Sequence, residues 1–215
     1  MNTPISPEAR IKDMVARGLV TPDEGTRLVG AAMGVPRAGL HVWRDPFPRF
    51  GGAPMLGLGS VAAVLAWSLH RFAIRYDGAF DLHLVAVARG AGGAAVDVIV
   101  SLGVGTLVAK GVVRLMGRSP RWVDVAGVVF AAHLPLALLG LLLAAVPAAR
   151  VLPPTPAALM LIVPASLLAL VWQVAWWVYG LRNATGLTGA VLTRLVVLSA
   201  LGTEVLSTLL LGVLP

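Results

Sequence analysis

The chain has 215 residues, of which 58% are hydrophobic and only 13% are charged, whereas a soluble domain has roughly 25% charged residues. This composition excludes a soluble monomer and a disordered chain, and the absence of cysteine excludes disulfide scaffolds and thiolate metal sites. The net charge of +7 comes mostly from arginines spread along an apolar chain, which favours a membrane-topology signal over nucleic-acid binding.

The polar segment 1–35 predicts a cytoplasmic hairpin of two short helices. Ser6 and the proline after it suit the start of a helix, and Gly18 ends it. Thr21 and Glu24 have the spacing of a capping box at the start of a second helix. This unit resembles the helical hairpins of the SHOCT type, which implies a role in homo-oligomerisation or contact with a protein partner. The alternative is a solvated stub that buries little surface.

Residues 36–54 are rich in proline, glycine and arginine and predict an interfacial linker. Arg44 and Arg49 alternate with aromatic residues, so we expect the rings at headgroup level and the guanidinium groups on lipid phosphates. Single-stranded nucleic acid can also bind such a pattern, but the linker leads directly into an apolar span, which favours lipid.

Five apolar runs are each long enough to cross a hydrocarbon core of ~30 Å. Backbone groups in lipid must bond within their own segment, so all five are predicted to be helices. The fold class is therefore all-α, a polytopic membrane protein whose residues 55–215 form a five-helix bundle. The predicted spans are residues 55–72, the run between Arg89 and Lys110, the run from Asp124 to Arg150, the run from Ala157 to Leu181, and the run from Gly189 to Pro215.

The basic residues predict the orientation of these spans. With the N-terminus inside, 13 of the 17 Lys and Arg residues are cytoplasmic, and the other four are outside. The excess of arginine over lysine and the Ala, Gly and Val-rich spans fit a GC-rich bacterial genome. We therefore expect a bacterial inner-membrane protein with a cytoplasmic N-terminus and a periplasmic C-terminus. The inner loop between the second and third spans is expected to contact anionic headgroups through Arg114, Arg118, Arg121 and Trp122.

Two acids interrupt the predicted spans. Asp97 lies in the second span and Glu204 in the fifth, and both are expected in the outer half of the membrane. If the helices adjoin, the two carboxylates could share a proton or bind a cation. The favoured interpretation is that each is protonated or bonded to the backbone or to a neighbouring hydroxyl group, of which the candidates are Ser101, Thr203 and Ser207.

His133 is the third ionisable residue within a span. It precedes Pro135 by two residues, so its imidazole is expected to bond a carbonyl group that the proline leaves free, in preference to binding a metal. The first outer loop holds a looser polar group that is expected to be solvated: His70, Asp77, Asp81 and His83.

Two further groups of residues predict packing. Ser101, Gly103 and Gly105 suit close helix contacts in the second span. The aromatic residues of the fourth span suit a substrate box or, as their cytoplasmic end favours, a membrane-interface belt: Trp172, Trp176, Trp177 and Tyr179.

Catalytic motifs are missing from the sequence. It contains no nucleophile elbow, His-Glu-x-x-His, phosphate-binding loop or dinucleotide fingerprint. We therefore expect a protein without enzymatic activity, cofactor or metal.

Two segments resemble a known family. Residues 117–135 join a basic loop to an apolar run that ends in proline, and residues 172–189 join an aromatic helix end to a short loop of glycine and leucine. With the five spans, they make residues 45–215 resemble the bacterial branch of the Yip (Ypt-interacting protein) family. Eukaryotic members act in vesicle trafficking and membrane shaping. Their Asp-Leu-Tyr-Gly-Pro motif is missing here, so the resemblance does not imply Rab-type GTPase binding.

The function expected from the sequence is a membrane-organising scaffold. Its partners are membrane lipids and, through segment 1–35, a second copy or another protein, but not nucleic acid. The alternative is a small ion-coupled or proton-coupled transporter, or a channel subunit, that uses Asp97 and Glu204, with His133 as a further candidate.

Overall fold

The computed structural model describes residues 7–32, 46–47, 52–76, 78, 80–146 and 154–213. The chain forms two compact units, Met1–Val42 and Trp43–Pro215, which are described separately. The boundary between the units falls within the predicted linker at 36–54.

The N-terminal unit is the predicted pair of helices, α1 (Pro7–Ala16) and α2 (Pro22–Ala32). Gly18 has a φ of +70°, the left-handed conformation that ends a helix. The capping box is confirmed: the Thr21 N–H donates to the Glu24 carboxylate at 2.9 Å, and the Glu24 N–H donates to the Thr21 hydroxyl at 3.3 Å. Gly25 of α2 lies against Val15 of α1 and brings the two helices together.

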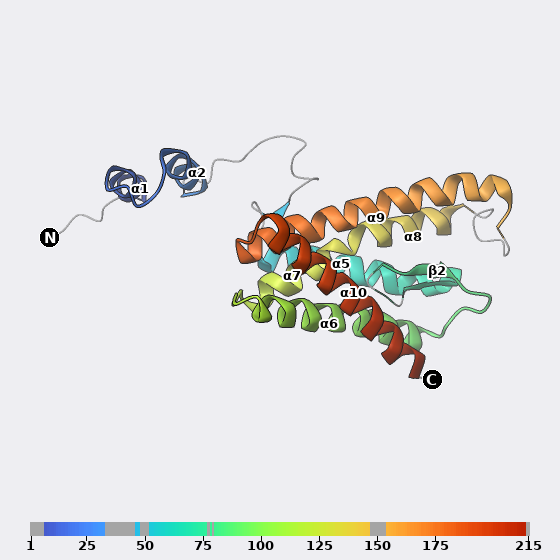
Figure 1. Cartoon of the computed structure of the whole chain (residues 1–215). Helices are drawn as coiled ribbons and strands as arrows, with labels where there is room; N and C mark the ends of the chain where they lie inside the picture. The colour runs from blue at the N-terminus through green and yellow to red at the C-terminus, as the bar shows by residue number, and fades with distance from the viewer. Residues whose placement is uncertain are drawn as a thin grey trace. The chain divides into compact units, whose positions relative to one another are not determined.

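The membrane unit contains the five predicted spans, all of them helical (Figure 1). The first ends in a short 3₁₀ helix, and the third is divided into two helices at His133. The spans are α5 with η1 (Gly52–Ser68 and Leu69–Phe72), α6 (Ala91–Leu115), α7 with α8 (Trp122–Ala132 and Leu134–Ala145), α9 (Pro156–Thr185) and α10 (Gly189–Val213). We use "inner end" for the end where α6 leads into α7 and α9 into α10, and "outer end" for the opposite one.

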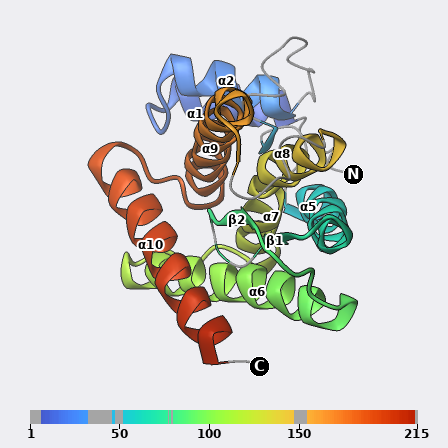
Figure 2. The same ribbon diagram turned by 90° about the vertical axis from the view of Figure 1, so that its right-hand side faces the viewer.

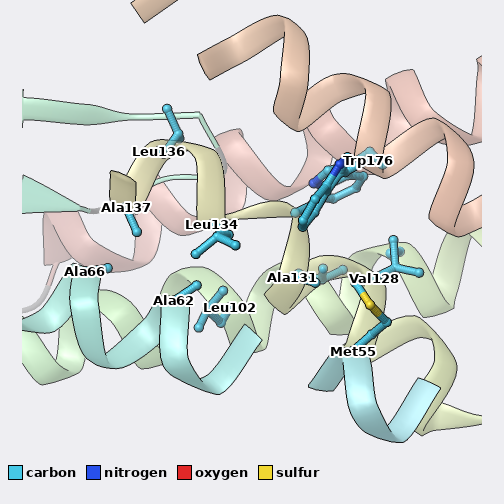
Figure 3. Close-up of a cluster of buried hydrophobic side chains, with 14 of the residues drawn as sticks. Met55, Ala62, Ala66, Leu102, Val128, Ala131, Leu134, Leu136, Ala137 and Trp176 are labelled. Atoms are coloured by element: carbon cyan, nitrogen blue, oxygen red, sulfur yellow. The ribbon is translucent and has the colours of Figure 1, made fainter. Parts of the chain in front are cut away.

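Glycine allows α5 and α7 to approach each other closely. A Cβ atom on Gly59 of α5 would lie 2.5 Å from the backbone carbon of Phe130, and one on Gly127 of α7 would lie 2.5 Å from the carbonyl oxygen of Gly52. Small residues serve this purpose in membranes, where lipid supplies no hydrophobic drive between helices. The core also contains small apolar side chains of α5 that face α7 and α8, such as Ala62 (Figure 3).

The small residues predicted to pack in α6 behave differently from one another. Ser101 is fully buried, and a Cβ atom on Gly105 would meet Val129 and Thr203 at 3.0 and 3.2 Å. Gly103, in contrast, has open space around its Cα atom. The packing prediction is therefore confirmed for two of the three positions.

A β-hairpin, which the sequence did not predict, is inserted among the helices from the outer end. Strand β1 (Ile74–Tyr76) pairs antiparallel with β2 (Leu82–Leu84), with Arg75 opposite His83. Ile74 and Tyr76 are buried, and Leu82 lies against Gly140 of α8. Figure 2 looks onto the outer end and shows both strands surrounded by the helices. The first outer loop is therefore not a loop throughout, because alternate residues of β1 face the apolar core, while the side chains of Asp81 and His83, which were expected to be solvated, stay 46% and 39% exposed.

The interface belt predicted for α9 is also wrong for two of its four aromatic residues. Trp176 and Trp177 are fully buried. Trp176 makes edge-to-face contacts with Phe47 and Trp172, with ring centroids 6.2 and 5.8 Å apart. Large aromatic side chains contribute most when they are buried against other rings, and these two face the bundle rather than the lipid interface.

The glycine contact between α5 and α7 predicts a difference between two matched substitutions. Gly59→Ala forces a methyl group against the Phe130 backbone and is expected to lower the stability by about 1–3 kcal/mol. Gly103→Ala, which enters open space within a span, is expected to be neutral or to stabilise by up to about 1 kcal/mol. Thermal unfolding monitored by tryptophan fluorescence in detergent measures both, and equal midpoints would contradict the proposed contact.

Candidate functional site

The Asp97 carboxylate binds the hairpin to α6. It is 2% exposed and accepts hydrogen bonds from Arg75 Nε at 3.1 Å and from Arg89 Nη1 at 2.6 Å. Arg75 lies on β1, and Arg89 lies just before the start of α6. A carboxylate this deeply buried is tolerated when opposite charges and hydrogen bonds compensate for lost hydration. The two guanidinium groups supply that compensation.

The Glu204 carboxylate holds the tip of the hairpin. Glu204 Oε2 accepts a hydrogen bond from the Phe80 N–H at 3.2 Å. A Cβ atom on Gly78 would lie 2.7 and 2.8 Å from the two Glu204 oxygens, so glycine is what allows the turn to approach them. The Phe80 ring contacts Trp177 of α9, with centroids 6.2 Å apart. The tip is therefore bound to both α9 and α10.

The two intramembrane acids thus bind different parts of one element, Asp97 the strand and Glu204 the tip. The interpretation that neighbouring hydroxyl groups bond these carboxylates is wrong for the three residues named. Each donates instead to a main-chain carbonyl oxygen of its own helix: Ser101, Thr203 and Ser207. The expected backbone bond is present for Glu204, but its donor is 124 residues away.

His133 occupies the break between α7 and α8. Its own N–H bonds the Phe130 carbonyl group at 3.3 Å, so the Val129 carbonyl loses its usual helical partner. The His133 Nδ1 atom bonds that carbonyl oxygen. The imidazole therefore bonds a free carbonyl group at the break, but not the predicted one, because the group that Pro135 leaves free is that of Ala131, four residues before it. Within the described ranges, no group of three metal-ligating side chains gathers at this or any other position.

The described polar residues of the first outer loop lie at two places, His70 in η1 before the hairpin and Asp81 and His83 at its tip and on β2. Asp81 and His83 are on the same side of an extended segment, and Asp81 Oδ1 is 3.2 Å from His83 Nδ1. His70 Nδ1 bonds the main-chain oxygen of Trp67 at 2.6 Å. Asp77 lies outside the described residues. The described members of this group are thus divided between two separate local contacts.

The turn between α6 and α7 is held by a buried lysine. Lys110 is 4% exposed, donates to the Pro120 carbonyl oxygen and lies 5.2 Å from the centroid of the Trp122 ring. Arg121 makes two hydrogen bonds to Asp124, at 2.9 and 3.1 Å, and this carboxylate raises the pKa of the Arg121 guanidinium. These contacts fix the geometry of the turn.

The predicted lipid contacts on this turn are exposed. Together with one apolar neighbour they form what we name the inner basic surface: Arg114, Leu115, Arg118, Arg121 and Trp122. Leu115 is 89% exposed and Trp122 is 52% exposed. The other two predicted contacts, Arg44 and Arg49, lie outside the described residues.

Comparison with known proteins assigns no family to the chain. No protein-family model, curated protein or solved structure matches it. The resemblance to the Yip family therefore stays a prediction from the sequence, and the function must be inferred from the residues themselves.

The contacts of Asp97 predict that it controls the stability of the hairpin. Asp97→Asn removes the charge that both arginines bind, and hydrogen bonds to charged groups contribute about 2 kcal/mol. Hydrogen–deuterium exchange of the amides of β1 and β2 should then accelerate roughly 30-fold. Asp81→Asn, which changes only a half-exposed contact with His83, is the matched control. Equal exchange in both variants would show that Asp97 does not hold the hairpin.

Proposed function

We propose that this chain is a membrane-organising scaffold of the Yip type, without enzymatic activity. In this proposal the inner basic surface gathers anionic lipid, and the N-terminal pair of helices binds a second copy or another protein. The bundle provides the multi-pass membrane anchor for both activities.

One observation carries the proposal, namely the composition and exposure of the inner basic surface. Arg114 and Arg118 are exposed at the end of a membrane span, next to the exposed side chains of Leu115 and Trp122. Arginine binds phosphate oxygens, while leucine and tryptophan enter the headgroup and acyl-chain boundary. Because Lys110 and Arg121 are engaged in holding the turn, Arg114 and Arg118 are the arginines best placed to bind headgroups.

The contacts of the intramembrane acids favour the scaffold over the transporter. A cation or proton site needs a carboxylate that is available to the transported ion. The Asp97 carboxylate has two guanidinium partners, and the Glu204 carboxylate has a main-chain N–H partner at the hairpin tip. Both acids are therefore better explained as residues that hold the hairpin.

We place the inner basic surface in the cytoplasm of a bacterial cell, in keeping with the distribution of arginine and lysine. The chain has no cysteine, so single cysteines can test this orientation. Ser119→Cys, in the exposed turn between α6 and α7, should be protected from a membrane-impermeant maleimide applied to spheroplasts. Ala86→Cys, exposed near the base of the hairpin, should be labelled. The reverse pattern would overturn the orientation.

The proposed lipid binding predicts that replacing the arginines of the inner basic surface lowers the selectivity for anionic lipid. Each arginine at an anionic surface contributes about 1 kcal/mol, so Arg114→Gln/Arg118→Gln should lower the preference for phosphatidylglycerol several-fold. Electron paramagnetic resonance with spin-labelled phosphatidylglycerol and phosphatidylcholine in liposomes measures this preference.

The single variants Arg118→Gln and Arg71→Gln form a matched pair for the same assay. Arg71 is an exposed arginine in η1, at the outer end of the bundle. Arg71→Gln removes the same charge from the opposite end and should change the preference less than Arg118→Gln. Equal effects of the two substitutions would contradict a specific inner surface.

A further inference from the structure

Four buried polar atoms in the described part of the membrane unit have no hydrogen-bond partner. Each belongs to a side chain that is 0–3% exposed, and none has a hydrogen-bond partner among the described residues. A buried polar group without a hydrogen bond lowers the stability of the fold by about 1–3 kcal/mol, so a partner is expected for each of these atoms. The atoms are Tyr76 Oη, His133 Nε2, Trp177 Nε1 and Ser199 Oγ.

Three of these side chains lie in one layer, at similar distances from the inner ends of their helices. His133 follows the start of α7 by 11 residues, Trp177 precedes the end of α9 by eight, and Ser199 follows the start of α10 by ten. At ~1.5 Å per residue these separations place them ~12–17 Å from the inner ends of their helices. That is about half of a ~30 Å hydrocarbon core.

Tyr76 brings the hairpin to this layer. Its ring meets the His133 ring edge-on, with centroids 5.4 Å apart. The two rings are thus in contact. The Tyr76 hydroxyl and the His133 Nε2 atom nevertheless both lack a hydrogen-bond partner among the described side chains. A small molecule that bonds both atoms would satisfy both residues at once.

A small cavity lies beside Tyr76 and Asp97. Its volume is about 10 Å³, enough for about one water molecule. Tyr76 forms part of its wall, and the polar residues around it are His70, Arg75, Arg89 and Asp97. Tyr76 thus borders a small polar cavity and also contacts the His133 ring.

The hydrogen-bond chemistry of the pair identifies the ligand. The Val129 carbonyl can only accept, so His133 Nδ1 carries the proton and Nε2 of the neutral ring is an acceptor. The Tyr76 hydroxyl can donate or accept. A water molecule that donates to Nε2 and bonds the hydroxyl matches both atoms.

We propose that Tyr76 and His133 hold a water molecule in the middle of the membrane, next to the cavity that Arg75, Arg89 and Asp97 line. Non-helical backbone is tolerated at membrane depth where protein buries it or where it borders water. The helices bury the hairpin, and the proposed water would bond its Tyr76 hydroxyl. This hydrated site is independent of the lipid-binding surface at the inner end.

Hydroxyl-radical footprinting of the full chain in nanodiscs tests this site, because X-rays generate the radical from water next to the side chain that it oxidises. Tyr76 and His133 are expected to be oxidised several-fold faster than Trp176. Trp176 is the matched reference, since it is 1% exposed and packs against other aromatic rings. Rates for Tyr76 and His133 no higher than that of Trp176 would overturn the proposal.

Tyr76→Phe tests the shared water directly. The variant keeps the ring contact and removes the hydroxyl, so oxidation of His133 should fall to the rate of Trp176. Unchanged oxidation of the exposed Trp122 verifies that the bundle is intact. An unchanged His133 rate in this variant would show that Tyr76 does not hold the water, and would also overturn the proposal.

Discussion

The inserted hairpin depends on one arrangement of charges, the Asp97 carboxylate between Arg75 and Arg89. Without the arginines, a carboxylate that is 2% exposed would be costly to keep charged. Without the carboxylate, the two guanidinium groups would repel each other at the base of the hairpin. Each partner therefore makes the position of the others possible, and together they fix β1 against α6.

The helices are organised around the space that this hairpin occupies. Glycine brings α5 and α7 into close contact on one side, while Phe80 and Glu204 bind the tip to α9 and α10 on another. The break at His133 falls where the Tyr76 ring meets the third span. Backbone groups at this break and in the hairpin lack helical partners. They lie where protein groups, and in our proposal water, can bond them.

The sequence predicts the features that depend on local chemistry. Charged residues are rare within membrane spans, so the five helices are predictable from the apolar runs. Capping residues act within one helical turn, so the capping box of Thr21 and Glu24 is predictable from its spacing. Asp97 and Glu204 are conspicuous for the same reason, but their partners lie as far as 124 residues away. The three-residue strands are too short to show a reliable alternation. A count of basic residues on each side of the membrane includes Arg75 and Arg89 only as charges, and it gives no sign that both bind Asp97.

The contacts of the arginines also change the meaning of the net charge of +7. At the outer end, Arg75 and Arg89 are bound by Asp97, so much of their charge is used inside the protein. At the inner end, Arg114 and Arg118 are exposed on a turn that other residues hold in place. Lys110 and Arg121 are likewise bound at the inner end, so the count of basic residues overstates the free charge on both sides of the membrane. In the proposed function, Arg114 and Arg118 are therefore the exposed arginines of the inner end that bind anionic headgroups.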